Sequence, residues 1–318
     1  MGSHMRHLFI VNPVAGKGKA LDYIPEIESC CCGSGEDYVI EVTKRHGHAT
    51  EIARNYSNTG TDRIYSVGGD GTLNEVLNGM AGSGSSLGII PSGSGNDFIR
   101  SMENYSEPVD IVRRTVFGPE SRIDLGRING RYFINIASIG FDAEVAYNAG
   151  KLKRLPGVSG KMAYVMGILS AVVNARSNRI KLCIDGECED LKSLLVAVAN
   201  GRYYGGGILP APEARLDDGL FDICLIREVS IQKILRCFPM MMKGTHGELE
   251  EVSFHRGKKI HILCDRAVPM NVDGEIVEGR EALIDIIPEG ITVIRPEAVN
   301  PSDRSKTKQS RVRTAVRQ

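Results

Sequence analysis

The sequence predicts a two-part α/β protein, with an N-terminal parallel sheet covered by helices and a mostly antiparallel β-sandwich after it. Two observations lead to this prediction. In the first third of the chain, short apolar runs alternate with helical patterns and glycine-rich loops, as in β–α units of a parallel sheet. After about residue 122, strand-like runs dominate, and helical patterns appear only at about 160–176 and 230–242.

Three of the strands expected in the first part end at glycine-rich loops. These strands lie at 8–11, 63–67 and 87–90, and a fourth strand is expected at 38–42. Ligands of open α/β sheets bind beyond the carboxyl ends of the strands. We therefore expect the three loops to lie together at one binding edge.

The change of pattern along the chain predicts two domains and a tail. Residues 5–127 form the expected α/β domain, to which the apolar run 291–297 can return, and 128–290 form the β-rich domain. Residues 298–318 are expected to be a disordered basic tail, because 304–318 hold six basic residues and no acidic residue.

Composition excludes several classes of protein. Lys+Arg and Asp+Glu both number 39, and this zero net charge argues against a nucleic-acid partner. The longest apolar stretch, 162–173, is too short to span a bilayer, and no signal peptide follows Met5, so a cytoplasmic location is expected. The eight cysteines have neither zinc-site nor disulfide-framework spacing, so free thiols are expected.

The loop Gly-Gly-Asp-Gly-Thr at 68–72 has the composition of a phosphate site. Glycines let the backbone approach a ligand closely, and a turn that opens a helix presents free N–H groups to phosphate. Asp70 adds a carboxylate that suits magnesium. The alternative is a tight turn in which Asp70 caps the helix.

The loop at 91–100 has the same organisation, with Gly-Ser-Gly-Asn-Asp at 93–97 and Arg100 one turn later. Two phosphate-cradling loops on adjacent strands are hard to explain by packing alone. The third loop, 12–19, lacks the first glycine and the Ser or Thr of a Walker A motif. Lys17 can still reach a phosphate, and a solvated lysine is the alternative.

Together the three loops resemble the diacylglycerol kinase catalytic domain family. The resemblance depends on Asn-Pro at 12–13 with Gly-Lys at 16–17, Gly-Gly-Asp-Gly-Thr at 68–72 and Gly-Ser-Gly-Asn-Asp-Phe at 93–98, and it covers about 5–297. The sequence is most similar to soluble bacterial lipid kinases. The second of these motifs alone is shared with NAD kinases, and the third separates the lipid kinases from them.

The resemblance implies an ATP- and Mg²⁺-dependent kinase that transfers the γ-phosphate to a lipid hydroxyl, foremost that of diacylglycerol, giving phosphatidic acid. It also implies a peripheral location at the inner membrane surface and a homodimer as one possible assembly. The acceptor lipid cannot be identified from the residues. The nucleotide-binding residues that it implies are Asn12, Lys17, Thr43, Gly68, Gly69, Asp70, Gly71, Thr72, Asn74, Gly93, Ser94, Asn96, Asp97 and Arg100.

Val-Asp-Gly-Glu at 272–275 matches the Asp-Gly-Glu element of the family. The match implies Glu275 as the general base on the lipid hydroxyl, with Asp70 as the second catalytic residue. From the residues alone, Asp-Gly between two strands is also typical of a hairpin turn. Asp124 is matched to an acidic residue of the family near the domain junction.

The segment 215–220 resembles one that binds a structural magnesium in bacterial members of the family. The resemblance implies the Asp218 carboxylate and the carbonyls of Arg215 and Leu220 as ligands, and oxygen ligands suit a hard cation. A plain β-turn is the alternative.

A basic and apolar segment at 151–173 is a candidate for docking on anionic lipid, with a core helix as the alternative. Two other functions remain open at this point. One is a nucleotide- or lipid-binding regulator without catalysis, and the other is a relative of the NAD kinases.

Overall fold

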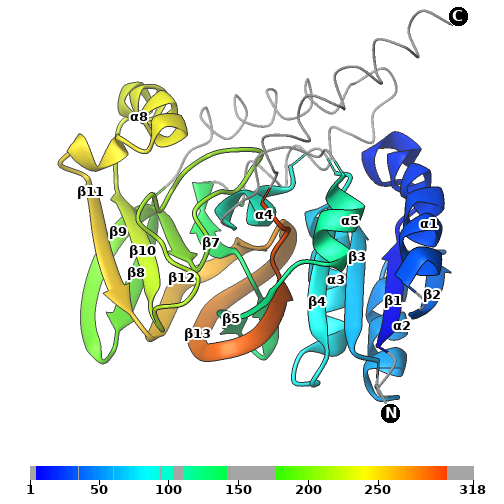
Figure 1. Cartoon of the computed structure of the whole chain (residues 1–318). Coiled ribbons are helices and arrows are strands. Elements are labelled where there is room, and N and C mark those ends of the chain that lie inside the picture. Colours follow the sequence, from blue (N-terminus) through cyan, green and yellow to red (C-terminus); the bar gives the residue numbers. More distant parts are fainter. Residues whose placement is uncertain are drawn as a thin grey trace, which may run out of the picture.

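The computed structural model describes residues 5–34, 36–59, 61–93, 95–102, 110–141, 143 and 177–298 (Figure 1). The membrane-docking candidate at 151–173, the helix expected at 160–176, Ser94 and residues 299–318 of the tail lie outside them. The elements in chain order are β1 (Arg6–Val11), η1 (Ala15–Tyr23), α1 (Ile24–Ser34), β2 (Asp37–Val42), α2 (His48–Ser57), β3 (Arg63–Gly68), α3 (Asp70–Met80), β4 (Ser86–Pro91), α4 (Asp97–Ser101), α5 (Ile111–Val116), β5 (Glu120–Ile128), β6 (Arg131–Phe133), β7 (Ile136–Gly140), β8 (Asn178–Ile184), β9 (Glu187–Ala199), β10 (Phe221–Arg227), α8 (Ile231–Lys243), η2 (His246–Glu248), β11 (Val252–Gly257), β12 (Lys259–Val272) and β13 (Glu275–Ile294).

The first four strands pair in parallel in the order β2-β1-β3-β4. Leu8 and Ile10 of β1 belong to the core with α2 and α3, whereas Phe9 and Val11 belong to the core with α1 and α5. Both faces of β1 are therefore covered, which explains its uninterrupted apolar sequence. Because β1 lies between β2 and β3, the strand order reverses there, and the loops after β1 and β3 border a crevice.

The parallel strands are only one end of a larger sheet, so the predicted fold class is confirmed in part. In the described residues one 13-stranded sheet continues from β4 through β13 into antiparallel strands. Val293 of β13 pairs in parallel with Leu87 of β4, while most of β13 pairs antiparallel with β12 and β5. The first part is thus not purely parallel, because β5 lies within 5–127.

The second part is mostly antiparallel, as predicted. The long strands β9 and β12 each pair with β7 near one end and with β8 near the other, so these four strands close a ring. Apolar side chains of all four strands form one core cluster. Helix α8, expected at 230–242, contributes Ile234, Cys237 and Met241 to a separate cluster with residues of β9 and β10.

The expectation of free thiols is wrong for one pair of cysteines. Cys183 of β8 and Cys188 of β9 stand opposite each other in the antiparallel register and form a disulfide. The turn between them is Asp185-Gly186, with φ of +49° and +97°. An Asp-Gly turn between two strands is a hairpin signal, and cross-strand neighbours bring their Cβ atoms within bonding reach. The other six cysteines form no disulfide.

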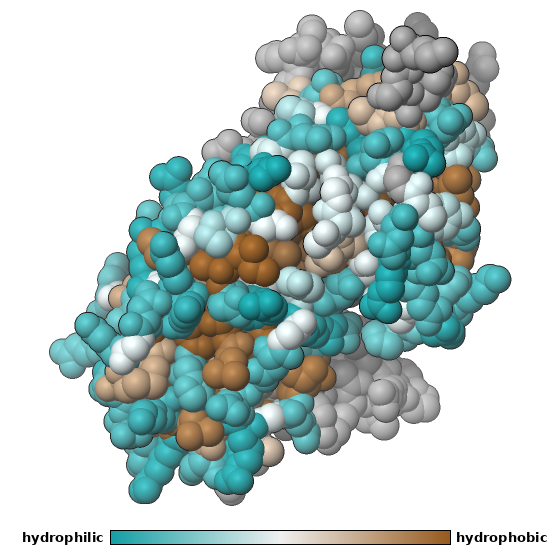
Figure 2. All heavy atoms as spheres, turned by 90° about the horizontal axis from the view of Figure 1, so that it is seen from below, coloured by the Kyte–Doolittle hydropathy of each residue, from teal (hydrophilic) through white to brown (hydrophobic). Residues whose placement is uncertain are grey.

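The outer surface of the β12–β13 hairpin alternates charged and apolar side chains. Leu263 and Leu283 are exposed, and their register partners are Glu281 and His261, which form an ion pair with each other. Viewed from below, apolar residues gather in the middle of the molecule between hydrophilic ones (Figure 2). No helix in the described residues is long and apolar enough to cross a membrane.

Replacement of Gly88 by alanine is expected to destabilise the parallel sheet. A Cβ at Gly88 would collide with the ring of Tyr65, which is fully buried and stacks on Phe9 with 4.3 Å between ring centroids. Overpacking of this kind costs about 1–3 kcal/mol. We expect urea unfolding of Gly88→Ala to show that loss. The matched control is Gly84→Ala, where a Cβ meets no atom within 4 Å, and an equal loss there would contradict the explanation.

Candidate active site

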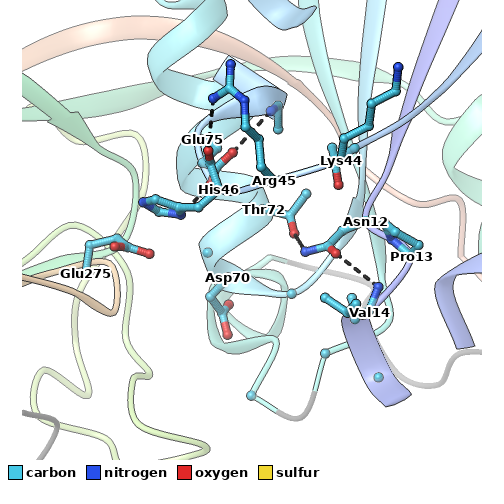
Figure 3. Close-up of a pocket in the computed structure, with 18 residues that line it drawn as sticks. Asn12, Pro13, Val14, Lys44, Arg45, His46, Asp70, Thr72, Glu75 and Glu275 are labelled. Carbon is cyan, nitrogen blue, oxygen red and sulfur yellow. Dashed lines mark hydrogen bonds and ion pairs between the residues drawn. The ribbon is translucent and has the colours of Figure 1, made fainter. Parts of the chain in front are cut away.

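The loops after β1, β3 and β4 meet the β12–β13 hairpin around a cavity of about 550 Å³ (Figure 3). Eight of the predicted site residues line it, namely Asn12, Thr43, Gly69, Asp70, Gly71, Thr72, Gly93 and Glu275. Lining residues that were not predicted are Pro13, Val14, Ala15, Gly16, Lys44, Arg45, His46, Ala49, Glu75 and Gly95. The cavity thus joins loops of the first part to a carboxylate of the second.

Asp70 holds the loop after β4 in place. Its Oδ2 and Oδ1 accept the backbone N–H groups of Asn96 and Asp97, each at 2.9 Å. A Cβ at Gly95 would lie 2.7 Å from Oδ2 of Asp70, and a Cβ at Gly93 would lie 2.6 Å from Cα of Gly69. Glycine is therefore required at both positions because the two loops approach each other so closely.

The loop after β1 is fixed to the other two. Asn12 donates from Nδ2 to Oγ1 of Thr72 at 2.9 Å, and its Oδ1 accepts the N–H of Val14 at 3.2 Å. Gly16 has φ of +61°, and a Cβ there would collide with the carbonyl of Ser92. Lys17 also has a positive φ, of +62°, and does not line the cavity.

Two carboxylates meet beside this cavity. Burial raises the pKa of Asp70, and it raises the pKa of Asp97 to about 6, although the N–H of Gly206 donates to Asp97 at 2.7 Å. The Asp70 charge also raises the pKa of Asp97. Oδ1 of Asp97 is buried and has no hydrogen-bond partner in the described structure. Carboxylate oxygens on two adjacent loops are donors of the kind that a hard divalent cation takes, although the described residues contain no cluster of three or more potential metal-ligating side chains.

Glu275 is positioned by the buried residue two places before it. Asp273 and Gly274 have φ of +50° and +92°, so the hairpin reading of Asp-Gly is also correct. The Asp273 carboxylate accepts the backbone N–H groups of Ile134, Asn135 and Ile136 at 2.8–3.1 Å. Burial raises the pKa of Asp273 to about 6, although these hydrogen bonds act to lower it.

The same carboxylate connects the hairpin to helix α3. Asn74 is fully buried and donates from Nδ2 to Asp273 at 3.4 Å, while Arg131 donates to Oδ1 of Asn74 at 2.5 Å. Asn74, predicted to bind nucleotide, therefore lies outside the cavity lining and links α3 to Asp273. The Asp-Gly-Glu motif contained Asp273, but the role of the Asp273 side chain could not be inferred from the motif.

The segment 43–47 is held to α3 by Glu75, which sequence reasoning missed. Its carboxylate accepts the N–H groups of Gly47 and Ala49 at 2.9 and 3.1 Å, and it lies 2.8 Å from Nδ1 of His46. Glu75 occupies the third position after Thr72 in the same helix. The helical period places it toward α2, and this was the one sequence signal for its role.

Five other predicted nucleotide-binding residues do not line the cavity. Asn96 has φ of +52° and exchanges two hydrogen bonds with Gly93, so it shapes the loop. Arg100 lies beside Gly207, where a Cβ would meet its Nη1 at 2.9 Å. The remaining residues outside the lining are Lys17, Gly68 and Asp97.

Asp124 is fully buried, joins three segments of the chain and does not line the cavity. Its carboxylate accepts the N–H groups of Gly219 and Glu289 at 2.7 and 2.9 Å, and its own N–H donates to the carbonyl of Leu216. These contacts join β5 to the turn at 215–220 and to β13. Both partners of the Asp124 carboxylate are backbone N–H groups, and its match to an acidic residue of the family stays a prediction.

The turn at 215–220 does not present a free ligand set. Asp218 accepts the N–H of Leu220 at 3.2 Å through Oδ1 and pairs with the Arg256 guanidinium through Oδ2. Arg215 pairs with Asp217 at 3.8 Å. A guanidinium thus already neutralises the carboxylate that the resemblance assigns to magnesium, so the residues as they lie do not fit that metal.

Comparison with known proteins agrees with this architecture. Residues 6–128 match the diacylglycerol kinase catalytic domain, and residues 135–295 match the YegS C-terminal NAD kinase beta sandwich-like domain. The chain is 35% identical over 303 residues to a diacylglycerol kinase of Mycobacterium tuberculosis, covering 90% of this chain and 94% of the relative. A probable YegS-like lipid kinase of Chromohalobacter salexigens is 30% identical over 288 residues, with 89% and 91% covered.

A solved structure shows the same arrangement of both parts. A putative diacylglycerol kinase from Bacillus anthracis superposes with a TM-score of 0.77 at 27% identity, covering 95% of this chain and 97% of that one. The fold is thus that of a two-domain protein in which glycine-rich loops line a cavity. The chain belongs to the diacylglycerol kinase family of lipid kinases, as the three motifs predicted.

The raised pKa of Asp97 predicts how stability varies with pH. A carboxyl group whose pKa is higher in the folded protein takes up a proton more readily when folded, so folding is favoured as pH falls. Relative to Asp97→Asn, the unfolding free energy of the unsubstituted protein should rise between pH 7 and pH 4, by at most about 3 kcal/mol. Metal-free urea titrations at several pH values measure this difference, and a pH-independent difference would contradict it.

Asp273→Ala is expected to lower the free energy of unfolding by about 3–5 kcal/mol, because three buried N–H groups lose their acceptor. Urea unfolding followed by circular dichroism measures this loss. The matched control is Asp285→Ala on β13, which removes a half-exposed ion pair with Arg127 and should cost less than about 1 kcal/mol. Similar losses in the two variants would refute the anchoring role of Asp273.

Proposed function

We propose that this chain is an ATP- and Mg²⁺-dependent lipid kinase that transfers the γ-phosphate to the hydroxyl of diacylglycerol, giving phosphatidic acid. One observation supports this above all: the glycine-rich loops and the Glu275 carboxylate line the same cavity. A Cβ at Gly71 would lie 3.5 Å from Oε1 of Glu275. Several relatives are named diacylglycerol kinase, which supports this acceptor.

The loops after β1, β3 and β4 would hold the phosphates of ATP through backbone N–H groups and short polar side chains. Phosphoryl transfer depends on positioning and charge neutralisation more than on covalent chemistry with the protein. Asn96 donates hydrogen bonds to Asp70 and Gly93, and Asn12 donates one to Thr72, so these loops are held in place before ATP binds. This preorganisation means that little ordering cost falls on the binding step.

Glu275 would accept the proton of the lipid hydroxyl. The hydroxyl oxygen forms a bond to the γ-phosphorus while the bond between that phosphorus and the bridging oxygen breaks, so ADP leaves. Asp273 holds the hairpin and thereby fixes where this carboxylate stands. Asp70 and Asp97 would hold Mg²⁺, whose charge offsets that of the phosphates when it is bound.

The acceptor must come from a lipid bilayer, so we propose that the protein works at the membrane surface, with a homodimer as one possible assembly. A nucleic acid is not part of the proposal. The exposed leucines of the hairpin, interleaved with charges, do not by themselves define a docking face.

The test is a transfer assay with γ-labelled ATP, Mg²⁺ and vesicles that contain diacylglycerol, phosphatidylglycerol, sphingosine or undecaprenol. We expect label in the diacylglycerol fraction. Glu275→Gln should keep ATP binding and lose transfer about 10²-fold or more, as expected for a general base. Glu278→Gln, an exposed glutamate on the same strand, is the matched control and should transfer normally.

Other outcomes have distinct meanings. Undiminished transfer by Glu275→Gln would remove this residue from the base role. ATP binding without label in any lipid would favour a regulator that lacks catalysis, and label in added NAD would favour an NAD kinase activity.

A further inference from the structure

The cavity contains few cations for a site that is to hold a triphosphate. Among the described residues that line it, the cationic or protonatable basic side chains are Lys44, Arg45 and His46. Arg45 donates to both carboxylate oxygens of Glu51, at 2.7 and 2.8 Å, so its charge is already paired. The Lys44 side chain extends away from Asp70 and Glu275 (Figure 3).

His46 is the remaining basic group, and its ring is turned toward Glu275 (Figure 3). Its side chain is 79% exposed, whereas that of its partner Glu75 is only 14% exposed. Nδ1 of His46 lies 2.8 Å from Oε1 of Glu75. A carboxylate can only accept, so Nδ1 carries the hydrogen of this contact, which leaves Nε2 for a ligand.

The imidazole of His46 is held in position by Glu75. Glu75 is itself held by the N–H groups of Gly47 and Ala49, and its backbone carbonyl accepts from Thr50 at 2.9 Å. A carboxylate that receives Nδ1–H fixes the orientation of the ring. The hydrogen bonds of Glu75 therefore fix the orientation of the His46 ring.

Three carboxylates line the same cavity as His46. They are Glu75 and Asp70 from α3 and Glu275 from the hairpin, and the Arg45 cation beside them is paired with Glu51. A bound triphosphate adds more negative charge to the same space. Opposite charges in proximity favour the ionised state of a histidine.

We propose that His46, oriented by Glu75, donates Nε2–H to the γ-phosphate of ATP and so supplies the cation that was predicted for Lys17 and Arg100. This inference rests on the proposed kinase function. His46 is then a substrate-contacting residue, and its contact exists with ATP but not with ADP. A charge-assisted hydrogen bond of this kind gives the site a preference for the triphosphate.

The test is calorimetric titration of the full chain with ATP and with ADP, in Mg²⁺ and without lipid. For His46→Gln we expect the Kd for ATP to rise about tenfold or more while the Kd for ADP changes less than about twofold. His46→Lys should keep the preference for ATP, because it retains the positive charge. His48→Gln is the matched control, because His48 accepts the Lys44 N–H and does not line the cavity.

Three results would overturn the proposal. An unchanged ratio of ATP to ADP affinity in His46→Gln would show that Nε2 does not contact the γ-phosphate. Equal losses in His46→Lys and His46→Gln would show that the charge is not what the ring supplies. Failure of the unsubstituted protein to bind either nucleotide would remove this inference and the proposed function together. If ATP binds but no lipid is phosphorylated, only the acceptor proposal fails, and the affinity ratio still decides the role of His46.

Discussion

The buried carboxylate of Asp273 is the interaction on which the candidate site depends. It accepts three backbone N–H groups, from the first residue of β7 and the two residues before it, and a hydrogen bond from the side chain of Asn74 in α3. Removal of a carboxylate from water is costly unless its lone pairs are satisfied. Because all of its partners come from outside the hairpin, the cost is recovered only when the hairpin, β7 and α3 stand in their native arrangement. The placement of Glu275 follows from that arrangement.

In the remainder of the site, the loops are held together by close contact of their backbones rather than by large side chains. Gly69, Gly93 and Gly95 let two loops contact each other, and Asp70 joins them by accepting N–H groups. Asp70 thereby has two functions that compete, since an oxygen that accepts N–H groups is less available to a cation. Asp97, with one partnerless oxygen, complements it. Asn12 adds the third loop through Thr72.

The sequence was most informative where residue identity determines local geometry. Glycine loops after apolar runs correctly predicted the strand–loop–helix units around β1, β3 and β4, and Asp-Gly correctly predicted the hairpin before Glu275. Tertiary partners were not encoded locally. Asn74 lies in α3, two residues after the Gly-Gly-Asp-Gly-Thr motif, yet its partner Asp273 is 199 residues away. The closure of the ring by β9 and β12 also depends on strand pairings between segments far apart in the chain, as does the continuation of the sheet past β4. The Cys183–Cys188 pair was missed although Asp185-Gly186 between them indicated a hairpin.

Strand β13 has a mechanical consequence for how the cavity can respond to its substrates. Over its 20 residues it pairs with β12, then β5, and finally β4, so one continuous strand crosses from the antiparallel to the parallel part. Hinge closure usually needs a few residues that absorb a large change in backbone angles. A hydrogen-bonded strand resists such a change, and rotation of one part against the other would break its ladder. Under the proposed function, selection among nucleotides then depends on groups of fixed position that either match the ligand or do not.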